Sequence, residues 1–173
     1  MTARIPVAVL GATGTVGQKL IRLLDRHPWF EVAAVTASDA SAGRPYREVV
    51  RWREPTPLPE RVGELVIGSS RVATPVALAF SALDTQAAAE IEPIWARAGA
   101  TVVTNASPFR LAPDVPLLVP EINAEHLDLL PGQRAARGWS GAIVANPNCT
   151  TTGLVVALAP LHQAFGVERL FVS

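Results

Sequence analysis

The amino-acid sequence predicts an α/β fold: a doubly wound, mostly parallel sheet with helices on its faces. Three observations support this fold class. Short apolar runs alternate along the chain with longer stretches of helical periodicity. A glycine-rich loop at residues 11–17 separates the first apolar run from the first helical stretch. Strand, helix and strand in this order imply parallel neighbours joined by right-handed crossovers.

The individual elements follow from the same pattern. We expect strands at residues 5–10, 30–35, 78–80, 101–104 and 142–144. We expect helices at residues 15–26, at 85–98 and from 149 onward. The apolar residues of the first helix share one face, which is its expected buried side: Val16, Leu20, Leu23 and Leu24.

Three segments do not fit the alternation. Residues 44–62 hold four prolines and are expected to be an excursion over the surface. Residues 114–125 contain an apolar run that Pro116 interrupts, and residues 133–141 are expected to be a polar loop.

Composition excludes several classes of protein. The chain has 173 residues, with 15 Lys and Arg against 15 Asp and Glu, so it can bury one good core and carries no formal net charge. We expect no nucleic-acid partner, because that binding needs a cationic surface. No apolar run approaches the ~20 residues of a membrane span, so we expect a cytoplasmic protein that is not bound to a membrane. No spacing typical of a metal site is present.

The glycines at 11, 14 and 17 predict a dinucleotide site. Gly11 permits a tight turn, Gly14 lets the backbone approach a pyrophosphate, and Gly17 allows close packing of helix and strand. Free N–H groups and the helix dipole favour phosphate at the N-terminus of the following helix. A plain tight turn is the alternative interpretation.

The end of the second strand indicates which dinucleotide is bound. NAD-binding folds usually carry an acid there, which holds the ribose 2′-hydroxyl. Here the segment carries Ser38 and Ser41, with Arg44 nearby, a set that suits a 2′-phosphate better. We therefore expect NADP, the alternative being an ordinary serine-rich loop in which Asp39 caps a turn.

Cys149 is the single cysteine, and it stands where a loop meets a helix. A helix N-terminus lowers the pKa of a thiol, which favours the reactive thiolate, and neighbouring threonines can cap the helix. Pro160 is expected to kink or split this helix. A buried structural thiol is the alternative. His27 and His162 are too far along the chain to act as its base, and His126 cannot be placed.

Four segments together resemble the aspartate-semialdehyde dehydrogenase family, in particular its archaeal and fungal branch. They are GATGTVG at residues 11–17, NASPFR at 105–110, VPEIN at 119–123 and NPNCTT at 146–151. The resemblance covers essentially the whole chain.

The resemblance implies roles for residues at matching positions. Cys149 would be the nucleophile that forms a thioester, Arg110 would bind phosphate, and Asn148 would orient the substrate. The remaining matches are to cofactor-binding positions: Gly11, Thr13, Gly14, Thr15, Val16, Ser38, Ser41, Ser81 and Asn105. The implied reaction is NADP-dependent conversion of L-4-aspartyl phosphate to L-aspartate 4-semialdehyde and phosphate, in amino-acid biosynthesis.

The chain is about half as long as members of that family, whose second half supplies the catalytic histidine and most of the dimer interface. We therefore expect residues 1–148 to form the NADP-binding domain and residues 149–173 to begin an α+β catalytic and dimerisation domain. We expect a homo-oligomer when the protein is complete, and little or no dehydrogenase activity from these residues alone.

Four other interpretations stay open. N-acetyl-glutamyl-phosphate reductase shares the chemistry but usually has glycine at the position of Asn148. Malonyl-CoA reductase has similar motifs. A module that binds NADP without catalysis is possible, and so is a redox-sensing thiol that depends on Cys149 alone.

Overall fold

The computed structural model describes residues 3–172 and contains one six-stranded sheet in which all strands are parallel. The strands are β1 (Ile5–Leu10), β2 (Phe30–Ala37), β3 (Gly68–Ser69), β4 (Leu78–Ser81), β5 (Thr101–Thr104) and β6 (Ala142–Ala145). Their order across the sheet is β3-β2-β1-β4-β5-β6. The chain therefore winds outward from β1 first in one direction and then in the other, and the predicted doubly wound fold is confirmed.

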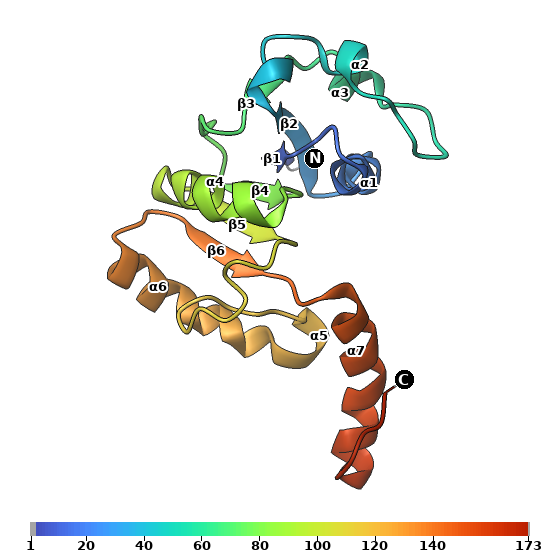
Figure 1. Cartoon of the computed structure of the whole chain (residues 1–173), viewed down its shortest axis with the longest axis vertical. Coiled ribbons are helices and arrows are strands. Elements are labelled where there is room, and N and C mark those ends of the chain that lie inside the picture. The colour runs from blue at the N-terminus through green and yellow to red at the C-terminus, as the bar shows by residue number, and fades with distance from the viewer. Residues whose placement is uncertain (1–2, 173) are drawn as a thin grey trace.

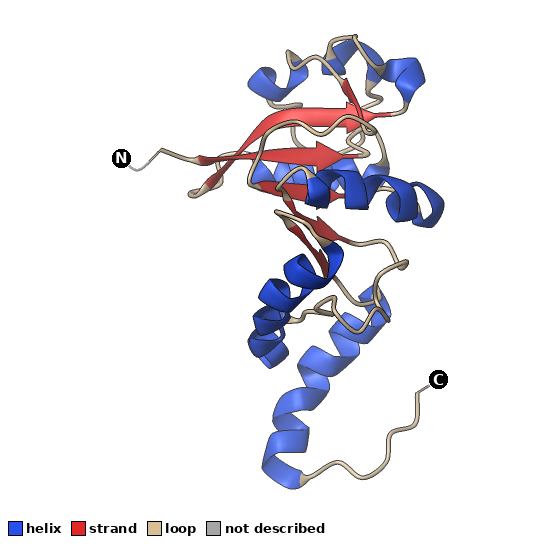
Figure 2. Cartoon of the chain, turned by 90° about the vertical axis from the view of Figure 1, so that its left-hand side faces the viewer, coloured by secondary structure: helices blue, strands red, loops and turns tan. Residues whose placement is uncertain are grey.

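Helices lie on both sides of this sheet (Figures 1 and 2). They are α1 (Thr15–Leu24), α2 (Tyr46–Val49), α3 (Glu60–Gly63), α4 (Thr85–Arg97), α5 (Pro120–Asn123), α6 (Leu130–Arg137) and α7 (Cys149–Phe165), with 3-10 turns η1 (Asp39–Ser41) and η2 (Ala124–Leu129).

Alternation along β1 divides the core between the two faces. Val7 and Val9 pack with α1, α2 and α3, whereas Ala8 and Leu10 pack with α4. Successive strand residues point to opposite faces, so a strand covered on both sides is apolar at every position. This explains why the central strands read as continuous apolar runs.

The predicted buried face of α1 was wrong in part. Val16 and Leu23 are exposed, and the helix instead buries Gly17, Gln18, Ile21 and Leu24. Gly17 must lie against the loop, because a Cβ there would be 2.4 Å from the Gly11 carbonyl oxygen. The buried face of α1 therefore includes Gly17 and not Val16.

Residues 44–62, predicted to be an excursion over the surface, also contribute to the core. Tyr46 is fully buried and its hydroxyl donates to the Ala12 carbonyl oxygen at 2.7 Å, directly beneath the glycine loop. The buried side chain of Gln18 holds the neighbouring loop by accepting from the Arg53 N–H at 2.8 Å. This segment therefore supports the loop from below.

Residues 133–141 are not the expected polar loop, because α6 occupies their first half. Gln133 is fully buried, and its side chain donates to the Ile143 carbonyl and accepts from the Ile143 N–H. The apolar run within residues 114–125 lies alongside β6, the strand that contains Ile143, and Leu117 forms a parallel bridge with Ala145. Both segments thus cover the outer edge of β6.

Helix α7 extends away from the sheet (Figures 1 and 2). It runs without interruption through Pro160, so the proline does not split it, and none of its residues is buried. No helix within residues 3–172 is both long and apolar enough to cross a membrane. The expected domain division after residue 148 stays a prediction.

Candidate functional site

Two cavities lie at the carboxyl edge of the sheet, beside the point where the connection after β1 leads to one side of the sheet and the connection after β4 leads to the other. Ligands of doubly wound sheets bind at such a switch point. The glycine-loop cavity, of about 540 Å³, is lined by Gly11, Thr13, Gly14, Ala37, Ser38, Asp39, Ser70, Arg71, Ala82, Leu83, Asp84, Ala87 and Ile91. The cysteine cavity, of about 640 Å³, is lined by Val16, Asn105, Arg110, Leu118, Val119, Pro120, Glu121, Asn146, Pro147, Asn148, Cys149 and Thr152.

Glycine stands at the three positions of the loop for different physical reasons. Gly11 has a φ of +71°, and a Cβ there would lie 2.8 Å from the Ala82 carbonyl oxygen. Gly17 has no room for a Cβ either. Gly14 is different, because its φ is −73° and a Cβ would meet only the Gly11 carbonyl oxygen, at 3.4 Å. The fold therefore does not require glycine at position 14. Gly14 lines the glycine-loop cavity, and a ligand in that cavity would explain the absence of a side chain there.

The N-terminus of α1 is suited to an anion. Gly14 is its N-cap, so no side chain caps the first N–H groups. Uncapped N–H groups and the positive end of the helix dipole attract phosphate.

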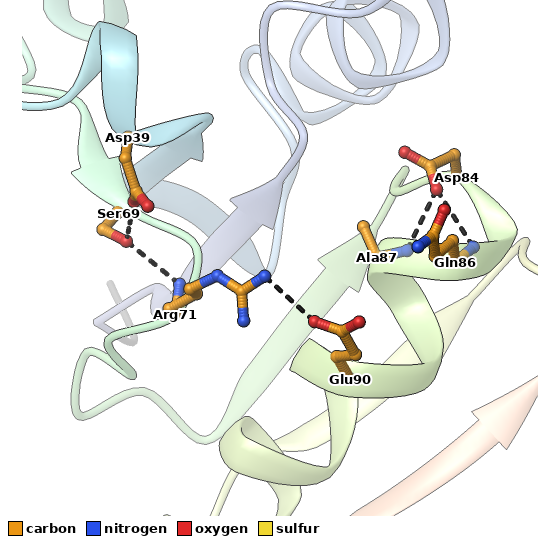
Figure 3. Close-up of polar contacts among 7 residues, drawn as sticks. All are labelled: Asp39, Ser69, Arg71, Asp84, Gln86, Ala87 and Glu90. Atoms are coloured by element: carbon orange, nitrogen blue, oxygen red, sulfur yellow. Dashed lines mark hydrogen bonds and ion pairs between the residues drawn. The ribbon is translucent and has the colours of Figure 1, made fainter.

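Charged side chains of the glycine-loop cavity come from both sides of the switch point (Figure 3). Asp39 follows β2 and accepts from the Ser69 hydroxyl at 2.5 Å. Arg71 follows β3, and its guanidinium donates to Glu90 on α4 at 2.9 Å. Asp84 caps α4 by accepting from the N–H groups of Gln86 and Ala87. Arg71 is thus the basic side chain of this cavity among residues 3–172.

The cysteine cavity gathers the predicted nucleophile and its neighbours. Cys149 is exposed and is the first residue of α7. Asn148 caps this helix, its side-chain oxygen accepting from the Thr150 N–H at 2.9 Å. Thr152 donates its hydroxyl to the Asn148 carbonyl oxygen at 3.1 Å. The cap is therefore Asn148 rather than one of the threonines.

Arg110 reaches the same cavity across the ends of β5 and β6. Its Nε donates to the Asn146 carbonyl oxygen at 2.9 Å and its Nη2 to the Asn105 carbonyl oxygen at 2.6 Å. The side chains of Asn105 and Asn146 are themselves joined at 2.8 Å. Nη1 has no hydrogen-bond partner in the described part of the chain, so its two donors are available to a ligand.

The structure brings most predicted site residues to one of the two cavities. Gly11, Thr13, Gly14 and Ser38 line the first. Val16, Asn105, Arg110, Asn148 and Cys149 line the second.

Three predicted cofactor residues and Arg44 line neither cavity. Thr15 is exposed at the start of α1, and Ser41 ends η1, with its N–H on the Ser38 carbonyl. Ser81 is fully buried. Arg44 is exposed, and Arg71 lines the glycine-loop cavity instead.

No histidine lines the cysteine cavity among residues 3–172. His162 lies near the far end of α7, as its position in the sequence implied. His126 is exposed in η2, where its Nδ1 lies 3.0 Å from the Asn123 side-chain nitrogen.

Sequence reasoning missed several cavity residues. Arg71 comes to its place because β3 pairs with β2, and β3 is only two residues long, too short to predict from a pattern. Asp84 could have been found, because an aspartate directly before a helix is a common N-cap. Asn146 and Glu121 stand inside the quoted motifs, but their spacing does not mark them as site residues.

Comparison with curated proteins gives relatives named aspartate-semialdehyde dehydrogenase. An aspartate-semialdehyde dehydrogenase of Methanothermobacter thermautotrophicus is 45% identical over 171 residues, which are 98% of this chain and 49% of the relative. One of Cryptococcus neoformans is 46% identical over 168 residues, 94% of this chain and 46% of the relative. The chain spans about half the length of the curated relatives it matches.

Solved structures agree with this comparison. Aspartate semialdehyde dehydrogenase from Candida albicans, crystallised with NADP, superposes with a TM-score of 0.85 at 39% identity, covering 94% of this chain and 48% of that one. Aspartate semialdehyde dehydrogenase II from Vibrio cholerae, complexed with ASA, gives 0.74 at 31% identity over 96% of this chain and 49% of that one. The sequence profile described as "Semialdehyde dehydrogenase, NAD binding domain" matches residues 6–130. This chain therefore belongs to the semialdehyde dehydrogenase NAD-binding domain family.

Proposed function

We propose that this chain is the nucleotide-binding part of an NADP-dependent aspartate-semialdehyde dehydrogenase, and that Cys149 is its nucleophile. The observation that carries the proposal is that the first turn of α1 borders both cavities. Gly14 lines the glycine-loop cavity, and Val16, two residues on, lines the cysteine cavity. A dinucleotide whose pyrophosphate rests on this helix N-terminus would extend into each.

The residues of the glycine-loop cavity fit NADP. The uncapped N-terminus of α1 and the open space beside Gly14 suit the pyrophosphate. Ser38 and Arg71 suit a 2′-phosphate, because a guanidinium donates charge-assisted hydrogen bonds to phosphate oxygens. Asp39 is the acid at this strand end, and its Oδ1 accepts from the Ser69 hydroxyl.

The cysteine cavity supports covalent acyl transfer. In the biosynthetic direction the Cys149 thiolate attacks the acyl carbon of aspartyl phosphate, a C–S bond forms, and the C–O bond to phosphate breaks. Nη1 of Arg110 would hold the leaving phosphate, and Asn148 would orient the substrate. When NADPH is bound, it supplies the hydride that reduces the resulting thioester to the aldehyde. Cys149 is then released as the thiolate.

Acyl transfer to Cys149 can be tested on this chain, because it precedes hydride transfer. We expect intact-mass spectrometry to find one acyl group after incubation with aspartyl phosphate, removable by hydroxylamine and absent from C149S. Failure to find an adduct on Cys149 would contradict the proposed nucleophile. NADP binding by C149S should stay close to that of the parent, because the change replaces a single atom in the cysteine cavity and leaves the glycine-loop cavity unaltered.

The same assay separates the alternatives within the superfamily. N-acetyl-glutamyl phosphate or malonyl-CoA acylating Cys149 faster than aspartyl phosphate would favour the corresponding reductase. We further propose that turnover needs a histidine from outside residues 3–172 and that the complete protein is a homo-oligomer. A chain that binds NADP and never acylates would be a binding module.

A further inference from the structure

Beneath the cysteine cavity, between α4 and the sheet, lies a buried polar cluster that the proposed chemistry does not use. Glu92 is fully buried on α4, and it faces the last residues of two neighbouring strands. These are Ser81 of β4 and Thr104 of β5, which are register partners and are themselves fully buried. Figure 1 shows α4 lying across these strands.

One oxygen of the Glu92 carboxyl is paired and the other is not. Oε1 accepts from the Thr104 hydroxyl at 2.5 Å. Oε2 and the Ser81 hydroxyl are both buried without a hydrogen-bond partner in the described part of the chain. A carboxylate at Glu92 could accept a hydrogen bond from the Ser81 hydroxyl but could not donate one, whereas a carboxylic acid could donate its O–H to the Ser81 oxygen.

The surroundings of Glu92 favour an uncharged carboxylic acid. The strands against which α4 packs here, β4, β5 and β6, carry no charged residue. No basic side chain within residues 3–172 forms an ion pair with Glu92. An isolated buried carboxylate is very costly, so such a group takes up a proton instead. Burial raises the pKa of Glu92, and the hydrogen bond from Thr104 offsets this only in part.

Thr104 passes the effect of Glu92 to the cysteine cavity. Its Oγ1 donates to Glu92 and accepts from the Ala106 N–H at 3.0 Å. Ala106 follows Asn105, whose carbonyl oxygen holds the Arg110 guanidinium. The acid therefore orients the Thr104 hydroxyl, and that hydroxyl fixes the turn that presents Asn105 and Arg110.

We propose that Glu92 is a neutral carboxylic acid that positions residues 105–110, and through them Arg110, from beneath the cysteine cavity. Its effect on catalysis rests on the proposed function, but its protonation and its effect on the turn do not. Glu92 touches neither cavity and acts only through Thr104.

Infrared spectroscopy of the 173-residue chain tests the protonation. The difference spectrum between the parent and E92Q at neutral pH should contain the C=O stretch of a protonated carboxylic acid. A carboxylate band in its place would overturn the proposal. E92Q is suitable because the amide can accept from Thr104 with its oxygen and donate to Ser81 with its nitrogen.

Amide hydrogen exchange tests the positioning without any substrate. E92L removes the acceptor for Thr104, and exchange of the Ala106 N–H should become about fivefold faster, the effect of losing one ordinary hydrogen bond. E92Q should keep the parent rate, and the amides of α1 should be unchanged in both variants. Equal Ala106 exchange in the parent and E92L, or equal acceleration in E92Q and E92L, would overturn the proposal.

A second pair of variants covers the case in which E92L does not fold. T104V removes the hydroxyl without changing the size of the side chain and should accelerate Ala106 exchange, whereas T104S should preserve it. An unaltered rate in T104V would also contradict the proposal. For catalysis, E92L should raise about fivefold the aspartyl phosphate concentration that gives half-maximal acylation of Cys149, and E92Q should leave it at the parent value. If neither the parent nor any variant is acylated, but Ala106 exchange changes as predicted, the proposed function fails and the positioning role of Glu92 stands.

Discussion

At the scale of single residues, the glycine-loop cavity depends on how its charges are already paired. Asp39 accepts a hydrogen bond from Ser69, whereas the Arg71 guanidinium is held within residues 3–172 only by Glu90, in an ion pair whose two side chains are about half exposed. Exposed ion pairs are worth little, so a phosphate can replace Glu90 as the partner of Arg71 at small cost. Arg71 is therefore the residue that we expect to distinguish NADP from NAD.

We predict that R71Q weakens NADP binding about tenfold and leaves NAD binding within about twofold, because it removes one charge-assisted contact to the 2′-phosphate. Isothermal titration of both nucleotides measures the ratio. R134Q is the matched control, since Arg134 is exposed on α6, lines neither cavity and makes the same change in net charge. Equal losses for NADP and NAD in R71Q would contradict this role.

A second residue-scale prediction concerns Asp114 and Arg137, an ion pair that is about one-quarter exposed. Arg137 also lies over the Trp139 ring, with its guanidinium carbon 4.9 Å from the ring centre. The hydrogen bond from Arg137 lowers the pKa of Asp114 below its usual value of 3.8. A lowered folded-state pKa stabilises the fold above the unfolded-state pKa, and that stability is lost as the pH falls through the folded-state pKa.

We therefore predict that D114N lowers the free energy of unfolding by about 1 kcal/mol at pH 7 and that the difference shrinks as the pH falls below about 4. Urea denaturation across this pH range measures it. D128N, at an exposed aspartate without an ion pair within residues 3–172, should differ little from the parent at either pH. A D114N effect that grows towards acid pH would have the wrong sign for this account.

At the scale of elements, the glycine loop separates what the fold requires from what a ligand requires. Gly17 faces backbone atoms that cannot move, whereas Gly14 faces open space in the cavity. The two glycines stand three residues apart in one motif, yet we expect substitution of Gly17 to lower mainly the stability and substitution of Gly14 to lower mainly NADP binding.

We predict that G17A destabilises the chain by about 2–3 kcal/mol through overpacking against Gly11 and Ala12. G14A should cost less, about 1 kcal/mol, because its φ suits alanine and the only penalty is that alanine is a poorer N-cap than glycine. It should nevertheless weaken NADP binding at least tenfold, as the methyl group occupies pyrophosphate space. Thermal unfolding with and without NADP measures both effects. Unimpaired NADP binding by G14A would contradict a pyrophosphate at this loop.

Elements with strong periodicity could be predicted from the sequence, and those fixed by tertiary contact could not. The strands at 5–10 and 101–104 agree with β1 and β5, and the helix at 85–98 agrees with α4 within a residue. Tyr46 was missed because no local pattern marks it: tertiary packing in the cluster around Val9 buries it, and its hydroxyl donates to Ala12. Gln133 was missed because a polar residue rarely indicates a core position. Its side chain makes the two backbone hydrogen bonds with Ile143 that a further strand would otherwise make.

The candidate site divides in the same way. The residues around Gly11 and Cys149 were found because local motifs carry them. Arg71 and Glu92 depend on which strands and helices become neighbours, and a single sequence does not contain that information in local form.

At the scale of the whole molecule, the order β3-β2-β1-β4-β5-β6 is what brings the two cavities together. The glycine loop follows β1, and the turn with Arg110 and the loop with Cys149 follow β5 and β6. Parallel strands bring all three to one edge of the sheet, although more than 130 residues separate Gly11 from Cys149 along the chain. The central claim is therefore that one dinucleotide site spans this edge.

Mapping NADP binding on the backbone amides by nuclear magnetic resonance tests that claim most directly. The account predicts shifts in two groups: Gly14, Ser38 and Arg71 around the first cavity, and Val16, Asn105 and Cys149 around the second. Amides near Trp29, at the opposite end of the strands, should not move. Shifts confined to one cavity, or found only away from the carboxyl edge, would contradict the account.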